Sequence, residues 1–319
     1  MTKRLHHLIR LMPLLFALAL GAVGSAWGAL PWTIIVPAGA GGGTDLSARV
    51  FAKYAQKVLQ VPVLVQNVPG EGGYRGSRLV ADAEAGRRLL LYTHAGIVTN
   101  HLTGLAPYAF DRFHVLGQLV SDDSLALMVR GDDPVTGVAD LIEAAREAPG
   151  ELRVATEFGA FTYFLMASLQ RQFDLRFALV EVGGDAAKLR ALLTGEVRLI
   201  PRVVVGIRPY LDEGDVRALG LVADERPAAA LDVPTFREQG VPFRFPPFPF
   251  MLFAPPSLAD DSVGRLRELV RRVTSMPAFR REIEAISMSA RYRDPDATAA
   301  MLRALAQDFA ALLPEGAKR

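Results

Sequence analysis

A strand, a run of glycines and a helix follow one another directly between residues 32 and 58, and this order constrains the fold more than any other feature. The apolar segment 32–36 ends at Pro37, which predicts a buried strand. Four glycines then fall within five positions: Gly39, Gly41, Gly42 and Gly43. The next segment has an apolar residue at every fourth position, which predicts a helix through Leu46, Val50, Tyr54 and Val58.

This order of elements predicts a binding site for an anion. Glycine lets the backbone turn sharply and lie close to a ligand. The start of a helix directs unpaired N–H groups and the positive end of the helix dipole to the same point, which suits a phosphate or a carboxylate. Thr44 or Asp45 is placed to cap the helix. The alternative is a tight turn that carries surplus glycines.

Length and composition indicate a globular protein of two domains. The chain has 319 residues, which is too long for one small core and suggests two domains. Of these residues 50% are hydrophobic and 22% are charged, as in a globular protein. It contains no cysteine, which excludes disulfides, thiolate catalysis and zinc–thiolate sites.

Residues 1–28 have the pattern of a signal peptide, with an uncleaved anchor as the alternative. Lys3, Arg4 and Arg10 precede the apolar segment 11–23, and small residues suited to cleavage follow. Removing these three basic residues from the total of 36 leaves 33 Lys+Arg against 34 Asp+Glu. The exported chain is therefore nearly neutral and has no basic stripe, so nucleic acid is not an expected partner.

From residue 31 onward, strand and helix patterns alternate. The strand patterns are apolar throughout, which predicts an α/β fold with mostly parallel sheets covered on both faces. The loops 39–45, 67–76 and 93–96 all follow strands, and ligands of such sheets bind beyond the carboxyl ends of the strands. We assign residues 29–125 with 225–319 to domain 1 and 126–224 to domain 2, with the return crossing within 217–254. Two crossing segments would form a hinge.

The sequence lacks the motifs of nucleotide-binding, serine-hydrolase and metal sites. The spacing for a dinucleotide loop fails because Thr44 stands where the third glycine belongs, and no acid follows the second strand at Asn67. A Walker A motif and a serine-hydrolase elbow are missing. The histidines after residue 28 are His94, His101 and His114, and they have no metal-ligand spacing.

Two glycine-rich runs occur in order along the chain: I-V-P-A-G-A-G-G-G-T-D-L-S-A-R and V-L-V-Q-N-V-P-G-E-G-G-Y-R-G. Together they resemble the signature of the tripartite tricarboxylate transporter receptors, also called Bug solute-binding proteins. The segments G-D-V-R-A-L-G-L and F-A-P-P-S-L extend the resemblance over essentially the whole exported chain. It implies a periplasmic, type II, Venus-flytrap-like binding protein. Such a protein captures a small organic carboxylate and delivers it to a membrane permease with one large and one small subunit.

The resemblance also implies where the ligand is bound. The first carboxylate would be bound by the loop 38–45, directly or through water, with the loop 70–76 and residues 93–94 on the same wall. Residues 158–163 and 183–184 match on the other domain. There Arg198 and Arg202 stand where the family often has acids, and either arginine would suit a second anionic group.

The predicted ligand-binding residues are Ala38, Gly39, Gly41, Gly42, Gly43, Thr44, Asp45, Gly72, Gly73, Thr93, His94, Phe158, Gly159, Thr162, Gly183 and Arg202. We expect no catalytic residue, metal or cofactor, and we expect a monomer. Two alternatives stay open from sequence: a ligand sensor for a membrane signalling kinase, and a nucleotide-using α/β enzyme.

Overall fold

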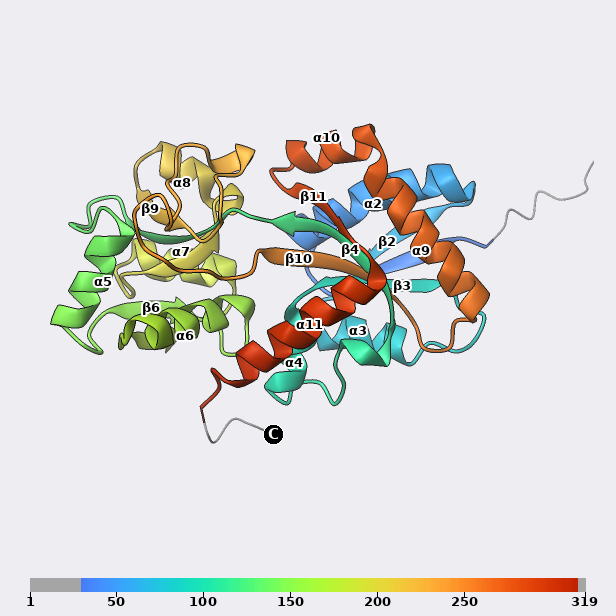
Figure 1. The fold of residues 1–319 in the computed structure, drawn as a ribbon, viewed down its shortest axis with the longest axis horizontal. Helices are drawn as coiled ribbons and strands as arrows, with labels where there is room; N and C mark the ends of the chain where they lie inside the picture. Colours follow the sequence, from blue (N-terminus) through green and yellow to red (C-terminus); the bar gives the residue numbers. More distant parts are fainter. Residues whose placement is uncertain (1–29, 315–319) are drawn as a thin grey trace, which may run out of the picture.

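The computed structural model describes residues 30–314, which form two lobes that lie side by side (Figure 1). The first lobe is built on a six-stranded sheet with the strand order β11-β4-β10-β3-β1-β2. The second lobe contains a three-stranded sheet, β8-β5-β9, and a two-stranded sheet, β6-β7. The predicted signal peptide lies outside the described residues.

The first sheet is mixed in direction. Its strands are β1 (Trp32–Val36), β2 (Val63–Asn67), β3 (Leu89–His94), β4 (His114–Asp122), β10 (Phe248–Ala254) and β11 (Ser289–Arg293). β1 pairs in parallel with β2 and β3, whereas β10 is antiparallel to both β3 and β4, and β11 is antiparallel to β4. The prediction of a mostly parallel sheet is therefore wrong. The reason lies in the connections: β4 leads out toward the second lobe and β10 returns from it, so these neighbours run in opposite directions.

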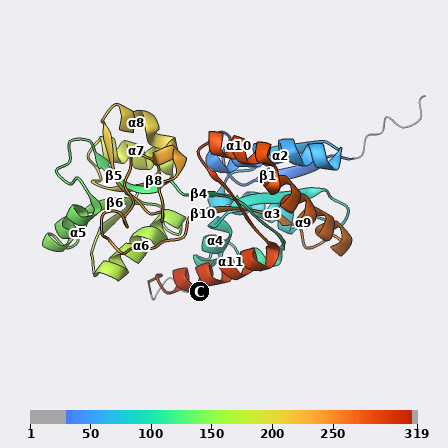
Figure 2. The same cartoon turned by 45° about the horizontal axis from the view of Figure 1, so that its top comes forward.

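Helices cover both faces of this sheet. One face packs against α2 (Gly43–Leu59), α9 (Asp260–Ser275) and α10 (Pro277–Ala285). The opposite face packs against α3 (Tyr74–Ala81), α4 (Gly96–Leu102) and α11 (Pro295–Ala310). Figure 2 shows the two layers on either side of the strands. This is the layered arrangement expected of an α/β fold.

The predicted helix after the first glycine run is present as α2, and its buried face matches the prediction in part. Tyr54 is 4% exposed, and Val50 and Val58 are partly buried against the core. Ala48, Phe51 and Ala55 are nearly inaccessible to solvent, whereas Leu46 is 40% exposed. Residues at spacings of three and four on this face include several alanines, which let the helix lie close to the strands.

The second lobe also alternates strands and helices. Its strands are β5 (Leu125–Arg130), β6 (Arg153–Thr156), β7 (Ala178–Glu181), β8 (Ile200–Val203) and β9 (Val216–Leu221). Its helices are α5 (Val138–Glu147), α6 (Phe161–Phe173), α7 (Asp185–Leu193) and α8 (Arg208–Asp212). β6 and β7 are parallel, while β5 is antiparallel to β8 and β9. Short 3₁₀ turns occupy Glu71–Gly73, Phe110–Arg112, Val205–Ile207 and Ala228–Ala230.

The chain passes between the lobes twice, and one helix bridges them. β4 continues almost directly into β5, and the carboxylate of Asp122 accepts hydrogen bonds from the backbone N–H of Ser124 at 2.8 Å and from its hydroxyl at 2.6 Å. The chain returns through residues 222–247 to β10. Phe309 near the end of α11 stacks on Phe164 of α6 at 4.3 Å, so α11 joins the core of the second lobe. Figure 1 shows α11 running from the first lobe toward the second.

Within residues 30–314, no helix is both long and apolar enough to span a bilayer.

Candidate functional site

The first glycine loop (residues 38–45) connects β1 to α2 and presents unpaired backbone donors. Gly41 has a φ of +82°, a left-handed conformation that favours glycine. Gly42 is the N-cap of α2 in an extended conformation. Within residues 30–314, no hydrogen bond engages the N–H groups of Gly42, Gly43, Thr44 and Asp45. These are the donors that a helix start leaves without an intrahelical partner.

Asp45 fixes the conformation of this loop from inside. One carboxylate oxygen accepts the N–H of Gly41 at 2.9 Å, and the other accepts the amide of Asn67 at 3.0 Å. Arg49 donates to the same carboxylate at 3.0 Å. Burial raises the pKa of Asp45, but the hydrogen bonds from Arg49, Gly41 and Asn67 outweigh it and leave the pKa below its usual value. Both oxygens have partners within the protein, so Asp45 positions the loop.

The predicted cap of α2 is wrong in both of its alternatives. The helix begins at Gly43, and its N-cap Gly42 has no side chain to offer. Asp45 is the third helical residue and reaches back to Gly41, one position before the N-cap. Thr44 is buried in the first turn.

The second glycine loop (residues 70–76) packs against Pro37, the residue before the first glycine loop. Gly72 and Gly73 both have positive φ angles. A Cβ at Gly73 would lie 3.2 Å from the carbonyl oxygen of Pro37, and one at Gly76 would lie 2.9 Å from the Cβ of Pro37. The amide of Asn100 donates to the Gly72 carbonyl at 2.9 Å. Glycine is needed at positions 73 and 76 because Pro37 lies so close to both.

The end of β3 brings Thr93 and His94 to the same edge of the sheet. The Nδ1 atom of His94 accepts the N–H of Gly96 at 3.0 Å, and the ring packs on Phe248 at 4.7 Å. Burial lowers the pKa of His94 to about 4, against an opposing effect of Asp185 in the second lobe. The imidazole is therefore neutral at pH 7, with its proton on Nε2.

The second lobe presents the loop between β6 and α6 to the first. Phe158 is 47% exposed and lies edge-on to Tyr163 at 5.0 Å. Gly159 has a φ of +80°, and a Cβ there would lie 2.6 Å from the Cγ2 of Thr103, at the end of α4. The two lobes are therefore in contact at this loop. Gly183 also has a positive φ, and a Cβ there would have no atom of residues 30–314 within 4 Å.

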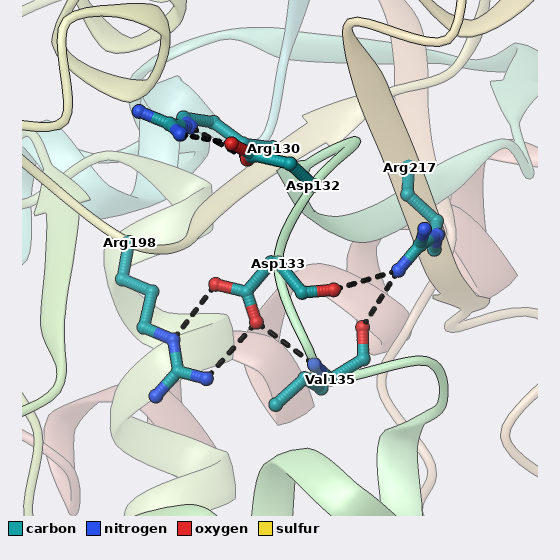
Figure 3. Close-up of polar contacts among 6 residues, drawn as sticks. All are labelled: Arg130, Asp132, Asp133, Val135, Arg198 and Arg217. Carbon is teal, nitrogen blue, oxygen red and sulfur yellow. Dashed lines mark hydrogen bonds and ion pairs between the residues drawn. The ribbon is translucent and has the colours of Figure 1, made fainter.

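Arg198 and Arg202 lie in different environments. Arg198 forms a two-bond ion pair with Asp133, at 2.8 and 2.9 Å, and Arg217 donates to the carbonyls of Asp133 and Val135 (Figure 3). Asp133 follows β5, at the end of that strand away from the crossing to the first lobe. Arg198 therefore forms an ion pair inside the second lobe, which accounts for this residue without a ligand.

Arg202 lies near the start of α7. Its two terminal nitrogens donate to the carbonyls of Asp185 at 2.9 Å and Gly206 at 3.1 Å. Its Nε is buried and has no partner within the described chain.

Sequence reasoning missed Lys188. This residue of α7 is only 2% exposed, and its ammonium donates to the hydroxyl of Thr162, a predicted site residue, at 2.9 Å. The signal was available: Lys188 stands three and four positions before the buried Ala191 and Leu192, on the apolar face of its helix.

A cavity of about 700 Å³ lies beside the crossing segments. Its lining includes Asp122, Arg226, Arg244, Phe245 and Arg291, and none of the predicted ligand-binding residues. Among the described residues, no group of three or more metal-ligating side chains converges.

Comparison with known proteins gives one consistent result. The Tripartite tricarboxylate transporter family receptor pattern matches residues 47–312. Protein BugT of Bordetella pertussis is 28% identical over 239 residues, which cover 74% of this chain and 73% of BugT.

Solved structures with the same fold include two from Rhodopseudomonas palustris. MatC, determined with bound malate, is 26% identical and superposes with a TM-score of 0.73 over 88% of this chain and 98% of MatC. Rpa4515, determined with adipate, is 24% identical and superposes with a TM-score of 0.76 over 88% of this chain and 95% of Rpa4515.

Proposed function

Because this chain belongs to the tripartite tricarboxylate transporter family of receptors, we propose that it binds a small organic carboxylate between its two lobes. The periplasm is the compartment expected of the family, and delivery to a membrane permease of one large and one small subunit is the corresponding transport step. The malate bound to MatC supports a carboxylate ligand.

The observation that carries the proposal is the set of N–H groups at Gly42, Gly43, Thr44 and Asp45 that no hydrogen bond from residues 30–314 engages. They converge at the carboxyl end of β1, where the helix dipole adds a positive potential. A carboxylate accepts such hydrogen bonds without a basic side chain, and hydrogen bonds to a charged acceptor each contribute about 1.5–3 kcal/mol.

The other predicted residues have two kinds of role in this proposal. The second glycine loop, Thr93 and His94 form the wall of the first lobe, and Asp45 holds the first loop in shape. Phe158, Gly159, Thr162, Gly183 and Arg202 form the opposing wall on the second lobe. Ligand contacts to both walls would stabilise the closed arrangement of the lobes. A permease that recognises this closed form would then bind the loaded receptor.

We place the return crossing later than residue 225. Phe236, Val241, Phe243 and Phe245 pack in the core of the second lobe. The first sheet resumes at Phe248, the first residue of β10. We therefore propose that residues 126–245 form domain 2 and that the two hinge segments are 122–125 and 246–248.

Titration calorimetry with mono-, di- and tricarboxylates tests the binding proposal. We expect saturable binding of at least one of these acids and no response to nucleotides, and binding of nucleotide alone would contradict the proposal. Uptake of the bound acid in cells with and without the permease genes separates transport from sensing.

A further inference from the structure

Lys188 is buried, and the acids around it act on its ammonium only from a distance. Among the described residues its ammonium, which has three donors, has one hydrogen bond, to the hydroxyl of Thr162. Within residues 30–314, no carboxylate lies within 4.0 Å of its nitrogen. A buried charge without a direct ion pair is costly, so stability alone explains this position poorly.

Three acids lie near Lys188 but act on it only at longer range. Burial lowers the pKa of Lys188, against opposing effects of Asp185, Glu157 and Glu181. Of these, Glu181 accepts a hydrogen bond from the backbone N–H of Phe158 at 2.7 Å. The carboxylate of Glu181 therefore holds the loop after β6.

Lys188 belongs to the part of the second lobe that meets the first. Its partner Thr162 is in the first turn of α6, directly after the loop in which Gly159 contacts Thr103 of the first lobe. Asp185 in the first turn of α7 is close enough to affect the pKa of His94 at the end of β3. Arg202 brings a second cation to this region, and its buried Nε has no hydrogen-bond partner in the part of the chain that the structure describes.

We propose that Lys188, together with Thr162 and Arg202, binds the second carboxylate of a dicarboxylate ligand. This inference rests on the proposed function, in which the first glycine loop binds the first carboxylate. A monocarboxylate of the same length would place a methyl group against the ammonium and leave the buried charge uncompensated. Lys188 would thus make the affinity for dicarboxylates higher than that for their singly charged analogues, because the analogues leave its ammonium without an anionic partner.

The experiment compares acids that differ by one carboxylate. Succinate, glutarate, adipate and malate are titrated against butyrate, pentanoate, hexanoate and 3-hydroxybutyrate, respectively. The proteins are the exported wild-type chain, Lys188→Met, Lys188→Arg and the surface control Lys57→Met. Circular dichroism and thermal midpoints establish that each variant is folded.

We expect the wild type to prefer at least one dicarboxylate over its analogue. Lys188→Met should weaken binding of that dicarboxylate by about 10- to 100-fold, because it loses a charge-assisted interaction in a desolvated site. Binding of the analogue should be unchanged or improved. Lys188→Arg should restore most of the affinity, and Lys57→Met should match the wild type.

Two results would overturn the assignment of Lys188 while leaving the proposed function intact. One is a wild type that binds the singly charged analogues as tightly as the dicarboxylates. The other is an equal loss for both acids in folded Lys188→Met. A wild type that binds none of the eight acids, or any other carboxylate, would instead refute the proposed function and this inference with it.

Discussion

Replacing Gly42 by valine should abolish binding at the proposed anion site while the protein still folds. Gly42 has φ −81° and ψ 169°, an extended conformation that a β-branched residue adopts readily. The nearest non-neighbouring atom to a Cβ at this position is the carbonyl oxygen of Gly39, at 3.8 Å. The Cβ of a valine is therefore accommodated without a clash among the described residues.

The expected change in stability is small. Valine is a poorer N-cap than glycine, which costs up to about 1 kcal/mol. Loss of glycine from the unfolded chain offsets about 0.4–1 kcal/mol of this. We expect the free energy of unfolding to change by about 1 kcal/mol or less, as measured by urea denaturation.

The expected change in binding is large. A valine side chain would occupy the space in front of the N–H groups of the first turn of α2. Loss of two hydrogen bonds to a carboxylate, at about 1.5–3 kcal/mol each, corresponds to an affinity lower by more than about 100-fold. Isothermal titration calorimetry with the acid that the wild type binds measures this loss.

Other glycines supply controls for this experiment. Gly264 lies on the exposed side of α9, where a Cβ would meet no atom within 4 Å, so Gly264→Val tests the same chemical change away from the site. Gly43→Val does not serve, because its Cβ would lie 2.5 Å from the Cε of Met288. A folded Gly42→Val protein whose affinity stays within about threefold of the wild type would refute the argument.

Three further predictions concern single side chains. Arg202→Ala should weaken dicarboxylate binding about 10-fold, or ~1.4 kcal/mol, and leave monocarboxylates little changed in calorimetry; equal losses would refute a contact with the second carboxylate. Asp45→Asn should lower the free energy of unfolding by about 1–2 kcal/mol at pH 7. Because the pKa of Asp45 is lowered on folding, its stabilisation is present above the usual carboxyl pKa and is lost as the pH falls through the folded value. The difference between Asp45→Asn and wild type should therefore shrink in acid, and a constant difference would contradict this. His94 has its pKa lowered from 6.5 to about 4, so the unfolded chain binds its proton first and stability should fall between pH 6.5 and 4, by up to about 3 kcal/mol. His94→Asn should flatten that part of the curve, and an unchanged slope would exclude His94 as its cause.

Local sequence patterns predict the first glycine loop and its neighbours well. The strand at Trp32–Val36 and the helix after it are observed as expected, because a buried apolar run, glycines and a four-residue period are local signals. The presence of both lobes also follows from the alternation of strands and helices.

Features that depend on distant segments could not be predicted in the same way. The direction of β10 follows from the path through the second lobe, and the exposure of Leu46 follows from which face of α2 meets the sheet. The role of Asp45 depends on Asn67, 22 residues away. Lys188 had a visible signal in its helix, but its burial against Thr162 requires the fold.

The measurement that tests the account most directly is a crystal structure with a bound dicarboxylate. We expect a carboxylate oxygen at about 2.7–3.2 Å from a backbone nitrogen of residues 42–45, directly or through one ordered water. Loops 38–45 and 70–76 should both face the ligand. A ligand bound elsewhere, with these N–H groups turned away from it or covered by the protein's own side chains, would contradict the account.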